Sequence, residues 1–130
     1  MKPPEPSTGL PGAKFRRREH LKKRDDITRV FKKGRSVTCP GVKLFYLENG
    51  LSHNRIAFTF ARKYGNAVER NRARRLGREA YRLLKKSAGN GYDLVLLAYP
   101  RTTENGGPKK LFLSLRMRQL EILFTKAGLL

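Results

Sequence analysis

The strongest constraint on the fold of this chain is a helix-length segment that lies between two strand-length segments. Residues 92–99 are almost continuously apolar and end at Pro100, a pattern typical of a central strand buried on both faces. Residues 55–61 predict a second strand, and residues 67–86 between them predict a long amphipathic helix. Because two strands joined by a crossover helix pair in parallel, the three segments predict a βαβ unit.

The rest of the chain predicts one helix and two strands before this unit and one helix after it. Asp25 or Asp26 is a good N-cap for a short helix, and Gly34 suits its C-terminal end. The other expected elements are strands at 35–38 and 42–48, a loop at 102–108 and a final helix at 109–126. The order αβββαβα predicts the α+β class: a single-domain sandwich with one mixed four-stranded sheet and helices packed on it.

The first residues of the chain differ in composition from the rest. Residues 1–13 are rich in proline and glycine and poor in apolar side chains, so they cannot bury enough surface to offset their ordering entropy. We therefore expect a disordered tail at 1–13 and a folded domain at 14–130. The domain begins with a densely basic arm at 14–24.

The charge of the chain limits the class of its partner. Thirty lysine and arginine residues against ten aspartate and glutamate residues give a formal net charge of +20. A compact domain with this charge repels itself, and a nucleic acid would relieve that repulsion and release counterions. An anionic membrane is the alternative partner, but the sequence shows no apolar run of about 20 residues, no lipidation motif and no secretory signal. We therefore expect a cytoplasmic protein that binds nucleic acid.

The helix predicted at 67–86 has one basic face and one apolar face. Arg70, Arg74, Arg78 and Arg82 repeat the same charge at every fourth position, and Arg75 lies on their side. Like charges at this spacing destabilise a helix, so a phosphate-bearing partner should compensate them. The alternative is a solvated face that only keeps the protein soluble. The apolar face, on which Gly77 indicates close approach to the sheet, comprises Ala73, Leu76, Gly77, Ala80, Leu83 and Leu84.

Three motifs in this order resemble one known family. The stretch Gly65-Asn66-Ala67-Val68-x-Arg70-Asn71-Arg72-x-x-Arg75-x-x-Arg78-Glu79 resembles the arginine-rich signature of the bacterial ribonuclease P protein. Asp26-x-x-x-Val30-Phe31-Lys32-x-Gly34 precedes it, and Tyr92-Asp93-Leu94-Val95 follows it, as in that family. The resemblance covers roughly residues 15–125, at the size and charge of the family.

The resemblance implies a function as an RNA-binding subunit. Proteins of this family bind a catalytic RNA that uses Mg²⁺ to remove the 5′ leader from precursor tRNA, so this chain would be the accessory subunit of an endoribonuclease whose catalysis is by RNA. Its partners would be that RNA and precursor tRNA, with no membrane and no obligate protein partner. The resemblance also implies a left-handed βαβ crossover, against the usual right-handed rule.

The resemblance assigns two groups of site residues. Ile27, Phe31 and Phe45 would line a cleft for the single-stranded leader; an aromatic residue is usual in the family where this chain has Ile27. Unpaired bases can stack on such rings, but an ordinary core role for Phe31 and Phe45 is the alternative. The residues that would face RNA are Arg70, Asn71, Arg72, Arg74, Arg75 and Arg78, with Arg62 and Lys63 near the substrate.

The sequence gives little support for catalysis by the protein itself. His20 and His53 are far apart and have no obvious carboxylate partner, and Cys39, the only cysteine, has no evident base. No catalytic residue and no metal ligand is therefore expected, and the metal would be bound mainly by RNA. Three alternatives remain: a ribosomal protein, a freestanding nuclease and a DNA-compacting protein.

Overall fold

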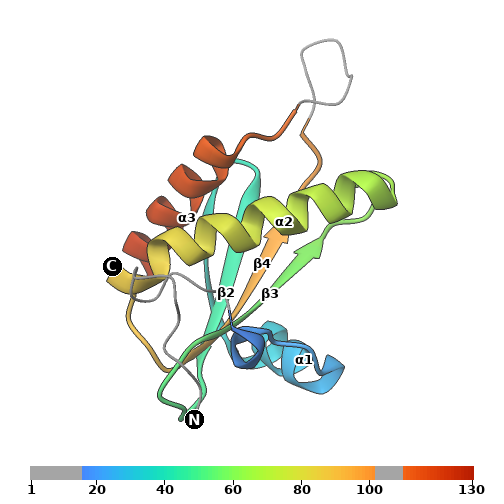
Figure 1. The fold of residues 1–130 in the computed structure, drawn as a ribbon. Helices are drawn as coiled ribbons and strands as arrows, with labels where there is room; N and C mark the ends of the chain where they lie inside the picture. The colour runs from blue at the N-terminus through green and yellow to red at the C-terminus, as the bar shows by residue number, and fades with distance from the viewer. Residues whose placement is uncertain (1–15, 102–109) are drawn as a thin grey trace, which may run out of the picture.

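The fold is seen in a computed structural model that describes residues 16–101 and 110–130 (Figure 1). The tail predicted at 1–13 and the loop predicted at 102–108 lie outside the described residues. The elements in chain order are η1 (Arg17–Glu19), α1 (Arg24–Lys33), β1 (Arg35–Cys39), β2 (Val42–Glu48), β3 (Arg55–Phe60), α2 (Ala67–Leu84), η2 (Lys85–Ser87), β4 (Tyr92–Ala98) and α3 (Leu113–Ala127).

The four strands form one mixed sheet in the order β1-β2-β4-β3. β3 and β4 pair in parallel, whereas β1–β2 and β2–β4 are antiparallel, which confirms the predicted βαβ unit. In Figure 1, α2 crosses in front of the sheet, and β4 lies to the left of β3 with both strands pointing upward. The crossover is therefore left-handed, as the resemblance implied.

The two faces of the sheet are covered unequally. The main core includes Leu44, Ile56 and Leu96 on the face covered by α2 and α3. On the opposite face α1 contacts β2 and β4, and a smaller cluster includes Val30 and Val95. The short helix α1 packs on this second face, which is where the predicted leader cleft lies.

The ends of two helices differ from the predictions. α1 begins at Arg24 after the N-cap Lys23, so Asp25 and Asp26 lie in the first turn, where they favour the helix dipole but do not cap it. α3 begins at Leu113 instead of 109. The reason is tertiary, since the carbonyl groups of the two residues before Phe112 accept hydrogen bonds from arginines elsewhere in the chain.

Gly34 ends α1 for a different reason from the predicted one. Its φ is −78°, so it does not need the left-handed conformation of a typical C-terminal glycine. A Cβ atom at this position would lie 2.5 Å from the carbonyl oxygen of Val30 and 2.8 Å from that of Tyr46. Glycine is therefore required by the close approach of the chain to β2.

The N-terminal boundary of α2 is fixed by a capping box. The Asn66 side chain accepts the Glu69 amide at 2.9 Å, and the Glu69 carboxylate accepts the Asn66 amide at 3.0 Å. At the other end the prediction was partly wrong, because Leu83 is 43% exposed while Tyr81 is buried. Tyr81 can lie in the core because its ring packs against Phe124 and its hydroxyl is hydrogen-bonded with Asn54; burial raises its pKa to about 12.

Gly77 lies where α2 approaches the sheet most closely, as predicted. A Cβ atom there would lie 2.7 Å from the ring of Phe58. Gly77→Ala would gain about 1 kcal/mol of helix propensity but force overpacking that costs about 1–3 kcal/mol, so we expect a net loss of stability. Urea unfolding measures the loss in the free energy of unfolding. Adding Phe58→Leu to Gly77→Ala should restore part of that free energy. A single variant more stable than the wild type would contradict the close packing.

Candidate nucleic-acid interface

One side of α2 presents five of the predicted RNA-facing residues together. Arg70 and Arg74 place their guanidinium groups 5.9 and 5.3 Å from the ring centroid of Phe60, and the Arg74 guanidinium also donates to the Asn71 side chain. Arg70 in addition donates from Nε to the Gly65 carbonyl at 3.1 Å. These contacts orient the groups before any ligand binds. The face comprises Arg70, Asn71, Arg74, Arg75 and Arg78.

The two carboxylates of α2 do not neutralise this face. Glu69 is used in the capping box, and Glu79 accepts two hydrogen bonds from Arg82, at 3.0 and 2.5 Å. Arg82, predicted as part of the like-charged row, is therefore compensated. Within residues 16–101 and 110–130, no carboxylate pairs with Arg74, Arg75 or Arg78. The uncompensated charge fits an anionic partner.

The other three predicted RNA-facing residues lie apart from this face. Arg72 points to the opposite flank of α2, where its Nη1 donates to the Leu111 carbonyl at 2.8 Å. Arg62 and Lys63 are exposed in the loop before α2, and Lys63 has a φ of +66° that turns the chain there. The structure therefore brings five of the eight residues together.

The predicted leader cleft is a partly open apolar surface between α1 and the sheet. The rings of Phe31 and Phe45 pack edge to face with centroids 4.8 Å apart, and Phe31 remains 37% exposed. Ile27 and Phe45 are only partly buried against the smaller core cluster. The exposure of Phe31 disagrees with an ordinary core role. The Lys43 ammonium nitrogen lies 5.0 Å from the Phe45 ring centroid. Lys43 was not among the predicted cleft residues, although its position two residues before Phe45 places it on the same face of the strand.

A pocket joins the cleft to the arginine face. Its lining includes Ile27 from α1, Thr59 from β3, and Arg74 and Arg78 from α2. His20, interpreted from the sequence as a surface residue, also lines this pocket. Its pKa is lowered, mainly by burial and to a smaller extent by the positive charge of Arg78. The predicted leader cleft and the predicted RNA face are therefore neighbours.

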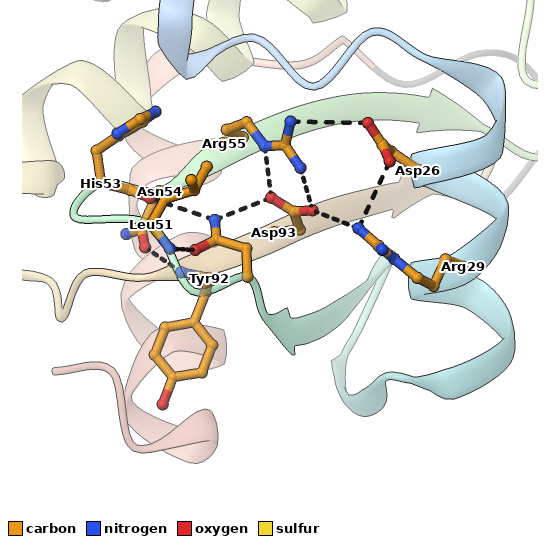
Figure 2. Close-up of polar contacts among 9 residues, drawn as sticks. Asp26, Arg29, Leu51, His53, Asn54, Arg55, Tyr92 and Asp93 are labelled. Carbon is orange, nitrogen blue, oxygen red and sulfur yellow. Dashed lines mark hydrogen bonds and ion pairs between the residues drawn. The ribbon is translucent and has the colours of Figure 1, made fainter.

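A buried polar network fixes α1 against the sheet (Figure 2). Asp93, fully buried in β4, accepts hydrogen bonds from Arg55 Nε at 2.8 Å and Nη2 at 2.7 Å, and from Asn49 at 3.0 Å. Arg29 of α1 lies 3.7 Å from the Asp93 carboxylate, and Asp26 lies within 3.6 Å of Arg29 and Arg55. The hydrogen bond that Arg55 donates to Asp93 raises the pKa of Arg55. This network was not predicted from the sequence, although Asp93 is a lone carboxylate in an apolar strand.

The described residues contain no group of three or more His, Cys, Asp or Glu side chains that could hold a metal ion. The carboxylates of Asp26 and Asp93 are engaged by arginines. Burial raises the pKa of Cys39, which disfavours its reactive thiolate. No helix in the described part of the chain is long and apolar enough to cross a membrane.

Comparison with known proteins decides the family. The model of the ribonuclease P family matches residues 15–121, which is most of the chain. The chain belongs to the ribonuclease P protein family. It is thus the protein component of the endoribonuclease that matures tRNA 5′ ends together with an RNA subunit. This membership sets aside the ribosomal, freestanding-nuclease and DNA-compacting alternatives.

Individual relatives support the same family. The ribonuclease P protein component of Natranaerobius thermophilus is 48% identical over 84 residues, covering 65% of this chain and 73% of that protein. The solved structure of the Staphylococcus aureus RNase P protein matches with a TM-score of 0.70 at 26% identity, covering 85% of this chain and 96% of that one. The Thermotoga maritima RNase P protein matches with a TM-score of 0.68 at 25% identity, covering 83% and 96%.

Proposed function

We propose that the chain binds the catalytic RNA through the arginine face of α2 and holds the 5′ leader of precursor tRNA in the cleft beside α1. The observation that supports this most is the shared pocket, in which Arg74 and Arg78 lie beside Ile27. Two RNA segments could therefore be held on adjoining surfaces. The protein would then bring the leader to the RNA subunit without taking part in the chemistry.

The cleft has the chemistry needed for a single strand. Phe31 and Phe45 offer aromatic surface on which unpaired bases can stack, for about 1–3 kcal/mol per base. Lys43 lies beside the Phe45 ring, where its ammonium group can pair with a backbone phosphate. Ile27 supplies apolar contact in place of a third ring. This arrangement favours single-stranded RNA without strong sequence preference.

Magnesium ions would be held mainly by the RNA subunit. The Asp26 and Asp93 carboxylates are occupied by Arg29 and Arg55, so they are poor ligands for a hard cation. The protein's cations would instead lower the repulsion between the phosphates of the two RNAs. We expect this work to take place in the cytoplasm, with no membrane and no obligate protein partner.

Cleavage of precursor tRNA tests the proposal directly. The host's ribonuclease P RNA is assayed at low and at high Mg²⁺, with and without the protein. We expect strong activation at low Mg²⁺, and cleavage by the RNA alone at high Mg²⁺. Absence of activation, or cleavage by the protein without RNA, would contradict the proposed role.

Phe31→Ala tests the leader cleft. Loss of the exposed ring should weaken binding of precursor tRNA by about 5-fold or more, because a base–aromatic stack contributes about 1–3 kcal/mol. Mature tRNA lacks the leader, so its affinity should hardly change. Both affinities are measured with the assembled holoenzyme, and Phe31→Leu, which keeps apolar volume without a ring, serves as the control for packing. Equal losses for precursor and mature tRNA would indicate a structural role instead.

A further inference from the structure

A pocket of about 310 Å³ lies between the N-terminal half of α2 and the segment that precedes α3. Arg72, Arg101 and Lys110 line it together with Tyr64. The carboxylate of Glu69 also lines it, but one of its oxygens already accepts a backbone amide at the start of α2. The lining therefore carries more positive than negative charge.

The two guanidinium groups of the pocket are held in place by the backbone. Arg72 donates to the Leu111 carbonyl at 2.8 Å, and Arg101 donates to the Lys110 carbonyl at 2.6 Å. Each contact uses one of the five N–H donors of a guanidinium, so further donors remain for a ligand. Neither arginine pairs with a carboxylate in the described part of the chain. Their positions are fixed without their charge being neutralised.

A buried cation lies against this pocket. Arg116 of α3 is 2% exposed, and its Nη1 donates to Gln119 at 2.8 Å while its Nε has no hydrogen-bond partner. Burial lowers the pKa of Arg116, and the ionisable side chains that affect it are Tyr64, Arg101 and Cys39, none of them a carboxylate. A buried charge of this kind is costly unless an anion compensates it.

Tyr64 connects the buried arginine to the pocket. Its ring is fixed against Phe60, with centroids 4.7 Å apart, and its hydroxyl is hydrogen-bonded with the Arg116 guanidinium. Because arginine can only donate, the hydroxyl oxygen is the acceptor in this contact. The hydroxyl proton is then available for a ligand in the pocket that Tyr64 lines.

We propose that this pocket binds a backbone phosphate of the ribonuclease P RNA. Arg72, Arg101, Lys110 and the Tyr64 hydroxyl would hold the phosphate oxygens, and Arg116 would contribute its buried charge. Beside the pocket Phe112 is 55% exposed and lies 5.6 Å from Lys110, which supplies aromatic surface for a base and favours a nucleotide over a free anion. The inference rests on the proposed function and extends the RNA surface to the α3 side of α2.

The test compares two variants that lose the same charge. Arg101→Ala/Lys110→Ala removes two cations of the pocket, whereas the control Lys86→Ala/Arg118→Ala removes two exposed cations elsewhere. Affinity for the host's ribonuclease P RNA is measured over a range of salt concentrations. Inorganic phosphate is titrated separately while the backbone amide signals of residues 110–112 are followed by NMR. Tyr64→Phe, which keeps the ring, tests the hydroxyl.

The pocket variant should lose the phosphate response at residues 110–112, and the slope of log affinity against log salt should fall by about 0.7–0.9, the value for one bound phosphate. The control Lys86→Ala/Arg118→Ala should keep both the phosphate response and the salt slope of the wild type. Tyr64→Phe should lower the affinity for inorganic phosphate several-fold without disturbing the structure. The inference is overturned if the pocket variant matches the control with RNA, including the case in which only free phosphate binds. Failure of the wild-type protein to assemble with the RNA would instead refute the proposed function.

Discussion

Replacing Arg74 and Arg78 together by alanine is expected to lower the affinity for the catalytic RNA by about 100-fold or more at moderate salt. A hydrogen bond that involves a charged group contributes about 1.5–3 kcal/mol, and each guanidinium can make one or more to phosphate. Neither side chain has a carboxylate partner in the described residues, so no intramolecular ion pair offsets the loss. The measurement is a binding titration at several salt concentrations, whose slope should fall by about 0.7–0.9 for each phosphate that the variant no longer binds.

Arg74 and Arg78 test this face more cleanly than Arg70 does. The Nε of Arg70 donates to the Gly65 carbonyl, so Arg70→Ala would also disturb the loop before α2. Lys86→Ala/Arg118→Ala is the matched control, because it removes the same charge from exposed positions outside the face. If the control lost as much affinity as the Arg74/Arg78 variant, the effect would be one of net charge, and the arginine face would not be a specific contact surface.

The secondary structure could be predicted from the sequence because its signals are local. The apolar run of β4 and the capping residue Asn66 each mark an element within a few neighbouring positions. The start of α3 could not be found in this way, because hydrogen bonds from Arg72 and Arg101 hold the preceding segment outside the helix. Nor could the left-handed crossover be derived from residue patterns; only the family resemblance implied it.

The sequence could predict which residues belong to the candidate site but not how they are arranged on the surface. Helical spacing placed Arg74 and Arg78 together and Arg72 on a different flank, but it did not show that Arg72 donates a hydrogen bond to the Leu111 carbonyl there. The meeting of this face with Ile27 depends on the tertiary structure, in which residues of α1, β3 and α2 line one pocket. The partners of the Asp93 carboxylate could not be predicted, because Asn49 and Arg55 come from distant segments of the chain.

Asp93→Asn is expected to lower the free energy of unfolding by about 3 kcal/mol. The Asp93 side chain is 1% exposed and accepts two hydrogen bonds from Arg55, so the substitution removes a charge from a buried pair and turns an amide N–H toward a group that can only donate. Breaking a buried ion pair costs about 3–5 kcal/mol, and we take the lower end because the Arg55 side chain is 24% exposed and can be partly solvated. Urea unfolding at neutral pH gives the measurement.

Asp26→Asn is the matched control for this prediction. It is the same substitution in the same network, but Asp26 is 22% exposed and its contacts with Arg29 and Arg55 are longer, at 3.5 and 3.6 Å. Its cost should therefore be about 1 kcal/mol or less. Equal stability losses for the two variants would show that burial of Asp93 does not set the strength of the network.

The same pair of variants separates the stability of the domain from the geometry of the cleft. Arg29 and Asp26 belong to α1, which carries Ile27 and Phe31, whereas Asp93 and Arg55 belong to the sheet. At temperatures where Asp93→Asn remains folded, loosening α1 should reduce the preference of the holoenzyme for precursor over mature tRNA, while assembly with the catalytic RNA through α2 should be retained. If that preference is unchanged, the network stabilises the fold but does not position the cleft for the leader.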